Sequence, residues 1–139
     1  MRGQIVGGDN TGVTPGTYLG LTVDAAGRIT AEVPLVISKQ FTQLVGTNGT
    51  YALDSYAAFP YTISGVNGIL TASGTISAQI LINGVAVTGL NSIAVNSSPQ
   101  NITATGNNSV VVGNRVTVVF SSNSSALGVE FSLAATRVQ

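Results

Sequence analysis

Few residues in this chain could do chemistry: five acids, one lysine and many serines. There is no histidine and no cysteine, so the commonest general base, the commonest metal ligand and the thiol nucleophile are missing. Asp54 and Glu130 could hydrolyse a glycosidic bond if the fold placed their carboxylates about 5 to 10 Å apart. Lys39 could be the base that a nucleophilic serine needs, although the surface is the ordinary place for a lysine. No spacing brings these residues together, so we expect no enzyme and no catalytic residue.

We also expect no cofactor and no metal. The segment GDNTG near the start offers the side-chain oxygens of Asp9 and Asn10, but calcium loops use a denser set of ligands. No glycine-rich stretch has the strand–loop–helix setting of a phosphate site. The 17 glycines are therefore assigned to turns.

Aromatic residues cluster between Tyr51 and Tyr61. Aromatic rings on a rigid scaffold can stack on sugar rings or anchor a protein contact, which makes Tyr51, Tyr56 and Tyr61 candidates for a surface contact. The alternative is that they fill the bottom of the sandwich or the junction between its two parts, and the ordinary burial of aromatic residues favours this alternative.

The composition is typical of an ordered protein with a weakly charged surface. Of 139 residues, 44% are hydrophobic and 7% are charged, and the net charge is zero, whereas disordered chains combine low hydrophobicity with high net charge. The basic residues are scattered, so we expect no nucleic-acid partner. The start lacks the apolar run of a signal peptide, and no stretch is apolar for long enough to predict membrane insertion.

The segment PGTYLGLTVDAAGRITAEVPL, residues 15–35, predicts two short strands around a tight turn. Asp24 suits the first position of a type I turn, and Gly27 tolerates the left-handed conformation with which the second strand leaves it. An isolated hairpin is marginal in water, so either the later part of the chain or neighbouring subunits must cover its apolar faces. We expect a subunit interface at the residues of these faces, which are Leu19, Leu21, Val23, Ile29, Ala31 and Val33.

The rest of the chain is expected to be all β, with residues 36–58 as a connector. The runs LVIS (35–38) and FTQLV (41–45) in this region are strand-like, and NGT (48–50) suggests a turn. From residue 59 onward, alternating runs are separated by turn clusters at the spacing of sandwiches and barrels, and Asn83-Gly84 is a strong hairpin signal. The expected strands are 60–64, 69–82, 85–89, 92–96, 100–105, 109–112, 115–122 and 127–137. Alternate residues share an apolar face in three places, namely Ile76, Ala78, Ile80 and Ile82; Val116, Val118 and Phe120; and Val129, Phe131, Leu133 and Ala135.

Residues 16–31, GTYLGLTVDAAGRITA, resemble the short repeat in the tail fibres of tailed bacteriophages. Ala26 stands where that family often has Lys or Asn. Residues 74–138 are similar to the small β-domain that ends some phage fibre and virion surface proteins. The matching residues of the repeat are Gly16, Thr17, Tyr18, Thr22, Val23, Asp24, Gly27, Arg28, Ile29 and Thr30.

The resemblance implies a homotrimer in a virion that is assembled in the cytoplasm of a bacterial host. Residues 1–35 would form an arm and a stalk-like hairpin, which attach to other virion proteins and trimerise. Residues 59–139 would form an antiparallel, jelly-roll-like β-sandwich head that could touch a host glycan or protein. A typical tail fibre has many such repeats and this chain has one. We therefore expect a short tail or collar fibre acting in host adsorption, with a trimeric capsid decoration protein as the alternative. A glycan-binding or glycan-degrading module is a further alternative.

Overall fold

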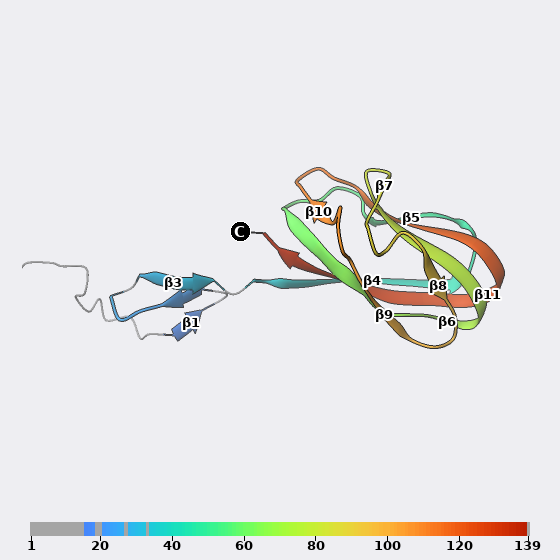
Figure 1. The fold of residues 1–139 in the computed structure, drawn as a ribbon, viewed down its shortest axis with the longest axis horizontal. Helices are drawn as coiled ribbons and strands as arrows, with labels where there is room; N and C mark the ends of the chain where they lie inside the picture. The colour runs from blue at the N-terminus through green and yellow to red at the C-terminus, as the bar shows by residue number, and fades with distance from the viewer. Residues whose placement is uncertain (1–15, 19–20, 27, 33, 139) are drawn as a thin grey trace, which may run out of the picture. The chain divides into compact units, whose positions relative to one another are not determined.

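A computed structural model describes residues 16–18, 21–26, 28–32 and 34–138 (Figure 1). The chain divides into two compact units, Met1–Leu35 and Val36–Gln139. The described residues form strands, turns and loops. They contain no helix that could cross a membrane. The all-β class predicted from the sequence is confirmed.

The first unit contains a three-stranded antiparallel sheet in the order β1-β2-β3. Its strands are β1 (Gly16–Tyr18), β2 (Leu21–Val23) and β3 (Ile29–Glu32). β2 and β3 form the predicted hairpin, and β1 adds a strand that the sequence pattern did not predict. Leu21 lies opposite Glu32 in this hairpin, and a register shift then brings Val23 opposite Ile29. An acidic residue is therefore the partner of Leu21.

The second unit begins with β4 (Val36–Val45) and β5 (Gly49–Asp54). The segment expected as a connector, residues 36–58, therefore contributes two strands to the sheet, and β4 spans the strand-like runs LVIS and FTQLV. β4 pairs with the end of the long strand β11 (Val116–Arg137), and β5 pairs with its beginning. Both strands pair with a segment far along the chain, and a local pattern does not reveal that pairing.

Strands β6 (Tyr61–Ile82) and β11 pair with each other along their whole lengths. The sequence predicts each of them as two shorter strands, and this prediction is wrong. The apparent interruptions are register shifts inside continuous strands, one set over Ser121–Ser125 and others between Glu130 and Ser132 and between Ala134 and Ala135. Glycine and serine at these places make bulges and not turns.

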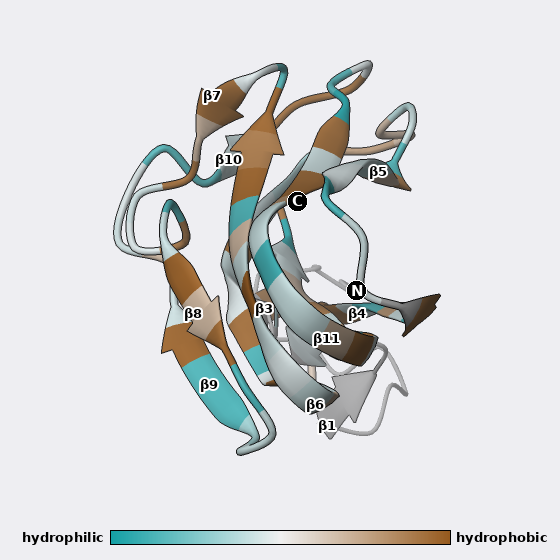
Figure 2. Cartoon of the chain, turned by 90° about the vertical axis from the view of Figure 1, so that its right-hand side faces the viewer, coloured by the Kyte–Doolittle hydropathy of each residue, from teal (hydrophilic) through white to brown (hydrophobic). Residues whose placement is uncertain are grey.

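Strands β6 and β11 both bend where Gly74 of β6 lies against Ser125 of β11. Ser122 and Ser125 have φ angles of 52° and 55°, and Gly74 has a φ of 67°. A Cβ on Gly74 would lie 2.3 Å from backbone atoms of Ser125, so the approach requires glycine. Bulges increase the bend and twist of a strand, and the sheet curves around the buried residues in a sandwich-like arrangement (Figure 2).

The remaining strands pair with the other side of β6. They are β7 (Val85–Ala86), β8 (Ile93–Val95), β9 (Gln100–Thr103) and β10 (Ser109–Val110). Asn83 and Gly84, with φ angles of 48° and 83°, join Ile82 to its partner Val85. The predicted two-residue hairpin turn is therefore confirmed.

The core of the second unit contains the three predicted apolar faces. Every residue of those faces is buried, so their prediction is confirmed. Ile63 from the first half of β6 and Ile80 from the second half belong to the same buried cluster. The two halves of the curved sheet therefore share one core.

Candidate interaction surfaces

Ile29 is the expected interface residue whose side chain the structure describes. It begins β3, and its side chain is 59% exposed. Leu21 and Val23 lie on β2 and Ala31 lies on β3, whereas Leu19 and Val33 lie outside the described residues. An exposed isoleucine on such short strands is apolar surface that a partner could cover.

Asp24 holds the turn between β2 and β3. Its amide donates to the carbonyl of Arg28 over 3.0 Å, and its Oδ1 accepts hydrogen bonds from the amides of Ala26 and Arg28. The guanidinium of Arg28 lies 2.7 Å from Oδ2. The hydrogen bonds from Arg28 hold the pKa of Asp24 below its ordinary value. Gly27, assigned to the same turn, lies outside the described residues.

The three candidate tyrosines occupy different environments. Tyr56 is 67% exposed, Tyr51 is half-buried, and Tyr61 is 1% exposed. A surface contact through Tyr61 is therefore wrong, because its ring is a core residue next to Phe59 and beneath Lys39. Tyr56 is the one of the three whose ring is free for a partner.

Tyr51 belongs to an aromatic cluster that joins β4, β5 and β11. Its ring centroid lies 5.9 Å from that of Phe41 and 5.7 Å from that of Phe120. Phe41 in turn stacks on Phe131 at 5.1 Å. The Tyr51 hydroxyl accepts a hydrogen bond from Gln43 Nε2 over 2.9 Å. The ring therefore fixes β5 against β4 and is not free to stack on a ligand.

Lys39, Asp54 and Tyr61 form a polar cluster at the boundary of the core. The Lys39 ammonium lies 2.8 Å from Asp54 Oδ2, and the Tyr61 hydroxyl donates to the same oxygen over 2.9 Å. Lys39 Nζ also lies 5.5 Å from the centroid of the Tyr61 ring. Lys39 is therefore not the exposed surface lysine that the sequence suggests.

The polar groups of this cluster are occupied with one another, which leaves none of them free to act as a catalytic base. Burial would raise the pKa of Asp54, but hydrogen bonds from Lys39 and Tyr61 outweigh it and lower the pKa below the ordinary value. Burial and the bond to Asp54 raise the pKa of Tyr61, so the phenol stays protonated and keeps donating. The cluster ties three strands together and offers no free base.

Asp54 and Glu130 lie on opposite sides of the β4–β11 layer. Lys39, the partner of Asp54, lies opposite the buried Leu133, whereas Glu130 lies opposite the exposed Thr42. Neighbouring strand residues of opposite parity point to opposite faces. The two acids therefore do not form the carboxylate pair that glycoside hydrolysis needs.

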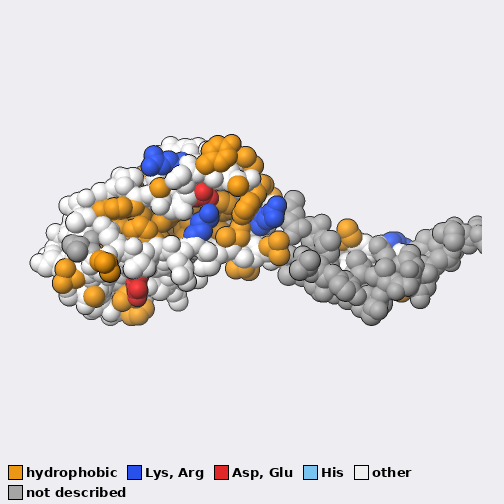
Figure 3. Space-filling model, turned by 180° about the vertical axis from the view of Figure 1, so that it is seen from behind, with side chains coloured by type: hydrophobic (Ala, Val, Ile, Leu, Met, Phe, Trp, Pro, Cys, Tyr) orange, Lys and Arg blue, Asp and Glu red, His pale blue; other side chains and the backbone are white. Residues whose placement is uncertain are grey.

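An apolar tip forms where the loop after β5 meets the loop before β11. Tyr56, Val111 and Val112 are exposed there, and backbone hydrogen bonds between Ala57 and residues Gly113 and Asn114 hold the two loops together. Figure 3 shows one side of the molecule, on which apolar side chains gather in patches and charged ones are sparse. We call Tyr56, Val111 and Val112 the apolar tip.

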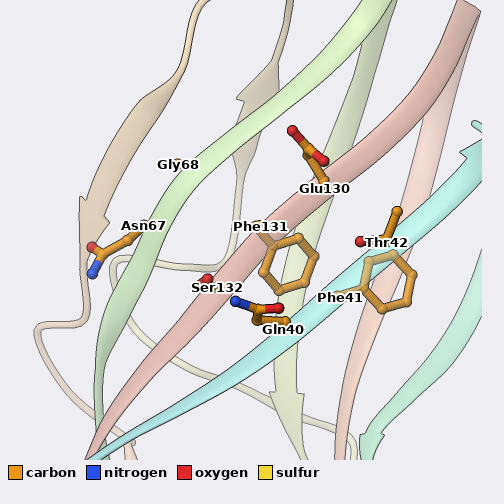
Figure 4. A pocket seen from close by; sticks show the side chains of 8 residues that line it. All are labelled: Gln40, Phe41, Thr42, Asn67, Gly68, Glu130, Phe131 and Ser132. Atoms are coloured by element: carbon orange, nitrogen blue, oxygen red, sulfur yellow. The ribbon is translucent and has the colours of Figure 1, made fainter.

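A polar groove of about 260 Å³ lies across β4, β11 and β6 (Figure 4). Gly68, with a φ of 64°, lies in the β6 bulge beside it. The groove offers one carboxylate together with amides and hydroxyls. The described residues contain no group of three His, Cys, Asp or Glu side chains that could hold a metal ion. The polar residues that line the groove are Gln40, Thr42, Asn67, Glu130 and Ser132.

Comparisons with known proteins give no family. No protein-family model matches the chain, and no curated protein matches it. Among solved structures, a chain from the structure of the infectious bursal disease virus Gx strain is similar, with 16% sequence identity and a TM-score of 0.32. The likeness covers 90% of this chain and 37% of that chain. At this TM-score the likeness carries no statement about function.

Proposed function

We propose that this chain is a structural protein of a tailed-phage virion, and that it forms a short trimeric tail or collar fibre acting in host adsorption. The observation that carries the proposal is the exposed Ile29 on a sheet of three very short strands. Strands of this size are marginal without further packing. The same segment carries the residues that resemble the phage fibre repeat, from Gly16 to Thr30.

Association of copies would supply the missing cover. Burying apolar surface between chains contributes about 25 cal/mol per Å², and closure around a threefold axis satisfies each copy in the same way. The second unit supports display and not catalysis, because Lys39, Asp54 and Tyr61 satisfy one another. Its apolar tip and polar groove are the surfaces that a host molecule could contact.

The mass in solution tests the trimer. By sedimentation velocity, we expect particles whose mass is a multiple of three 14.0 kDa chains. Ile29→Asn should abolish trimer formation, so that the mass is no longer a multiple of three chains, because it puts an amide into the proposed apolar contact. Val85→Asn is the control, since Val85 is an equally exposed aliphatic residue of the second unit. A wild-type chain that stays monomeric at micromolar concentration contradicts the proposal.

Labelling of intact particles tests the location. An antibody against the second unit should bind at the tail or collar. Binding over the shell would instead support the capsid decoration protein. Absence of the chain from purified particles would reject both.

A further inference from the structure

β4 is the longest strand of the described sheet with a free edge. It has 10 residues, and it pairs with β11 on one side and with no described strand on the other. Its register with β11 runs from Val36 to Val45 without a shift, and the strand contains no proline. An edge that is long, regular and free of proline is a template for pairing with another chain.

The charge that could protect this edge is turned away from it. Proteins often keep edge strands apart with a lysine, and Lys39 is the only charged residue of β4. Its ammonium is engaged with Asp54 and lies over the ring of the buried Tyr61. The opposite face of β4 carries Val36, Ser38, Gln40, Thr42 and Leu44, all of them exposed and uncharged.

The two ends of this face carry the two most exposed large apolar side chains of the described residues. Val36 is 81% exposed and Leu44 is 86% exposed. If a second copy of β4 pairs antiparallel about a twofold axis at Gln40, Val36 lies opposite Leu44 of the second copy. Ser38 then lies opposite Thr42, and Gln40 lies opposite Gln40. Every cross-strand pair on the face therefore joins side chains of like polarity, which is the arrangement that stabilises paired strands.

We propose that two copies of this chain pair edge to edge through β4, antiparallel, about a twofold axis at Gln40. The pairing extends the β4–β11 layer into a sheet that runs through both copies. It uses residues of the second unit and is independent of the trimer contact proposed for Ile29. Where both contacts form, each β4 pairing joins two trimers.

Disulfide cross-linking of single-cysteine variants tests the proposed register of the two β4 strands, because the chain has no cysteine of its own. Residues directly opposite in an antiparallel pair have Cα atoms about 4.5 to 5.5 Å apart, within the range of roughly 4.4 to 6.8 Å that a disulfide requires. Gln40→Cys should therefore give a covalent dimer under mild oxidation. Ser38→Cys and Thr42→Cys are matched controls on the same exposed face. In the proposed register each lies about 13 Å from its own copy, so we expect at least tenfold less dimer.

Each outcome of this scan decides the proposal. Preferential cross-linking of Gln40→Cys supports it. Equal cross-linking at all three positions would mean parallel pairing, and a maximum at Ser38→Cys or Thr42→Cys would mean another register; either result overturns it, as does the absence of any dimer. The scan is repeated with Ile29→Asn added. A dimer that persists there shows that β4 pairing holds even if the trimer proposal fails.

A charge exchange provides a second measurement at exposed positions, where folding is not at risk. Val36→Glu alone or Leu44→Lys alone should weaken dimerisation roughly tenfold, a loss of about 1.4 kcal/mol, because each sets a charge opposite an apolar side chain of the second copy. The double variant sets Glu opposite Lys and should recover most of that loss. Two single effects that simply add in the double variant would overturn the pairing of residue 36 with residue 44.

Discussion

One carboxylate oxygen of Asp54 accepts hydrogen bonds from both the ammonium of Lys39 and the hydroxyl of Tyr61. These residues come from β4, β5 and the start of β6, so a single oxygen joins three strands. Hydrogen bonds to a charged group contribute more than neutral ones when they are sheltered from water. The cluster should therefore matter for stability although it does no chemistry.

Tyr61→Phe tests this contribution while it keeps the buried ring. The change removes the hydroxyl that donates to Asp54 and should lower the free energy of unfolding by about 1.5 to 3 kcal/mol. Urea unfolding followed by tyrosine fluorescence is the measurement, since the chain has no tryptophan. Tyr56→Phe, at the exposed apolar tip, should change stability by less than about 0.5 kcal/mol. Equal effects of the two variants would show that the hydroxyl of Tyr61 contributes nothing.

The same carboxylate predicts a pH dependence. Because the pKa of Asp54 in the folded chain is below its ordinary value of 3.8, folding favours the ionised form. The stability from Asp54 is therefore fully present above the unfolded pKa and is lost as the pH falls through the folded pKa. Asp54→Asn should be less stable than the wild type at neutral pH and should lose less stability as the pH falls from about 5 to below 3.8.

Glu130→Gln is the control for this titration. It removes the same charge from the exposed groove, away from Lys39 and Tyr61. It should keep the wild-type loss of stability in acid. If Asp54→Asn and Glu130→Gln have the same acid profile, the ion pair does not account for the pH dependence.

At the scale of elements, the bend in β6 and β11 determines how the sheet encloses its core. Gly74→Ala should destabilise the second unit by about 3 kcal/mol or more, because a Cβ would lie 2.3 Å from the backbone of Ser125. Gly68→Ala is a matched control, since Gly68 has a similar φ and open space around it. It should cost about 1 to 2 kcal/mol. Thermal unfolding of both variants measures the difference, and equal costs would contradict the steric explanation.

Local signals in the sequence were sufficient for some elements and insufficient for others. Asn83-Gly84 predicts its turn because both residues favour the φ angles that the turn needs. The strand-like runs LVIS and FTQLV mark the residues of β4, but nothing local shows its pairing, because its half-buried face includes the polar Lys39 and Gln43 and its partner β11 lies far along the chain. The serines over Ser121–Ser125 predict a turn, yet β6 continues beside them and makes the segment a bulge.

The candidate sites show the same limit. The exposure of Tyr56 and the burial of Tyr61 depend on which loops and strands meet around them, and the two residues stand close together in the sequence. The groove requires β4, β6 and β11 to lie side by side. Its residues are separate in the sequence, and no local pattern joins them.

At the scale of the whole molecule, charge is too sparse to hold copies together. The chain has five basic and five acidic residues, and Arg28 with Asp24 and Lys39 with Asp54 are already paired within it. Both proposed contacts between copies use apolar side chains and strand edges. Such contacts do not weaken when salt screens charges.

The assembly should therefore keep its mass when salt is added. Raising the ionic strength from 0.1 M to 1 M shortens the screening length from about 10 Å to about 3 Å, and sedimentation velocity should give the same mass at both. The double variant Val36→Glu, Leu44→Lys is the internal control, because its β4 pairing would depend on charge and should weaken as salt rises. Dissociation of the wild-type assembly in 1 M salt would mean that ionic contacts hold the copies, and both proposed interfaces would then be wrong.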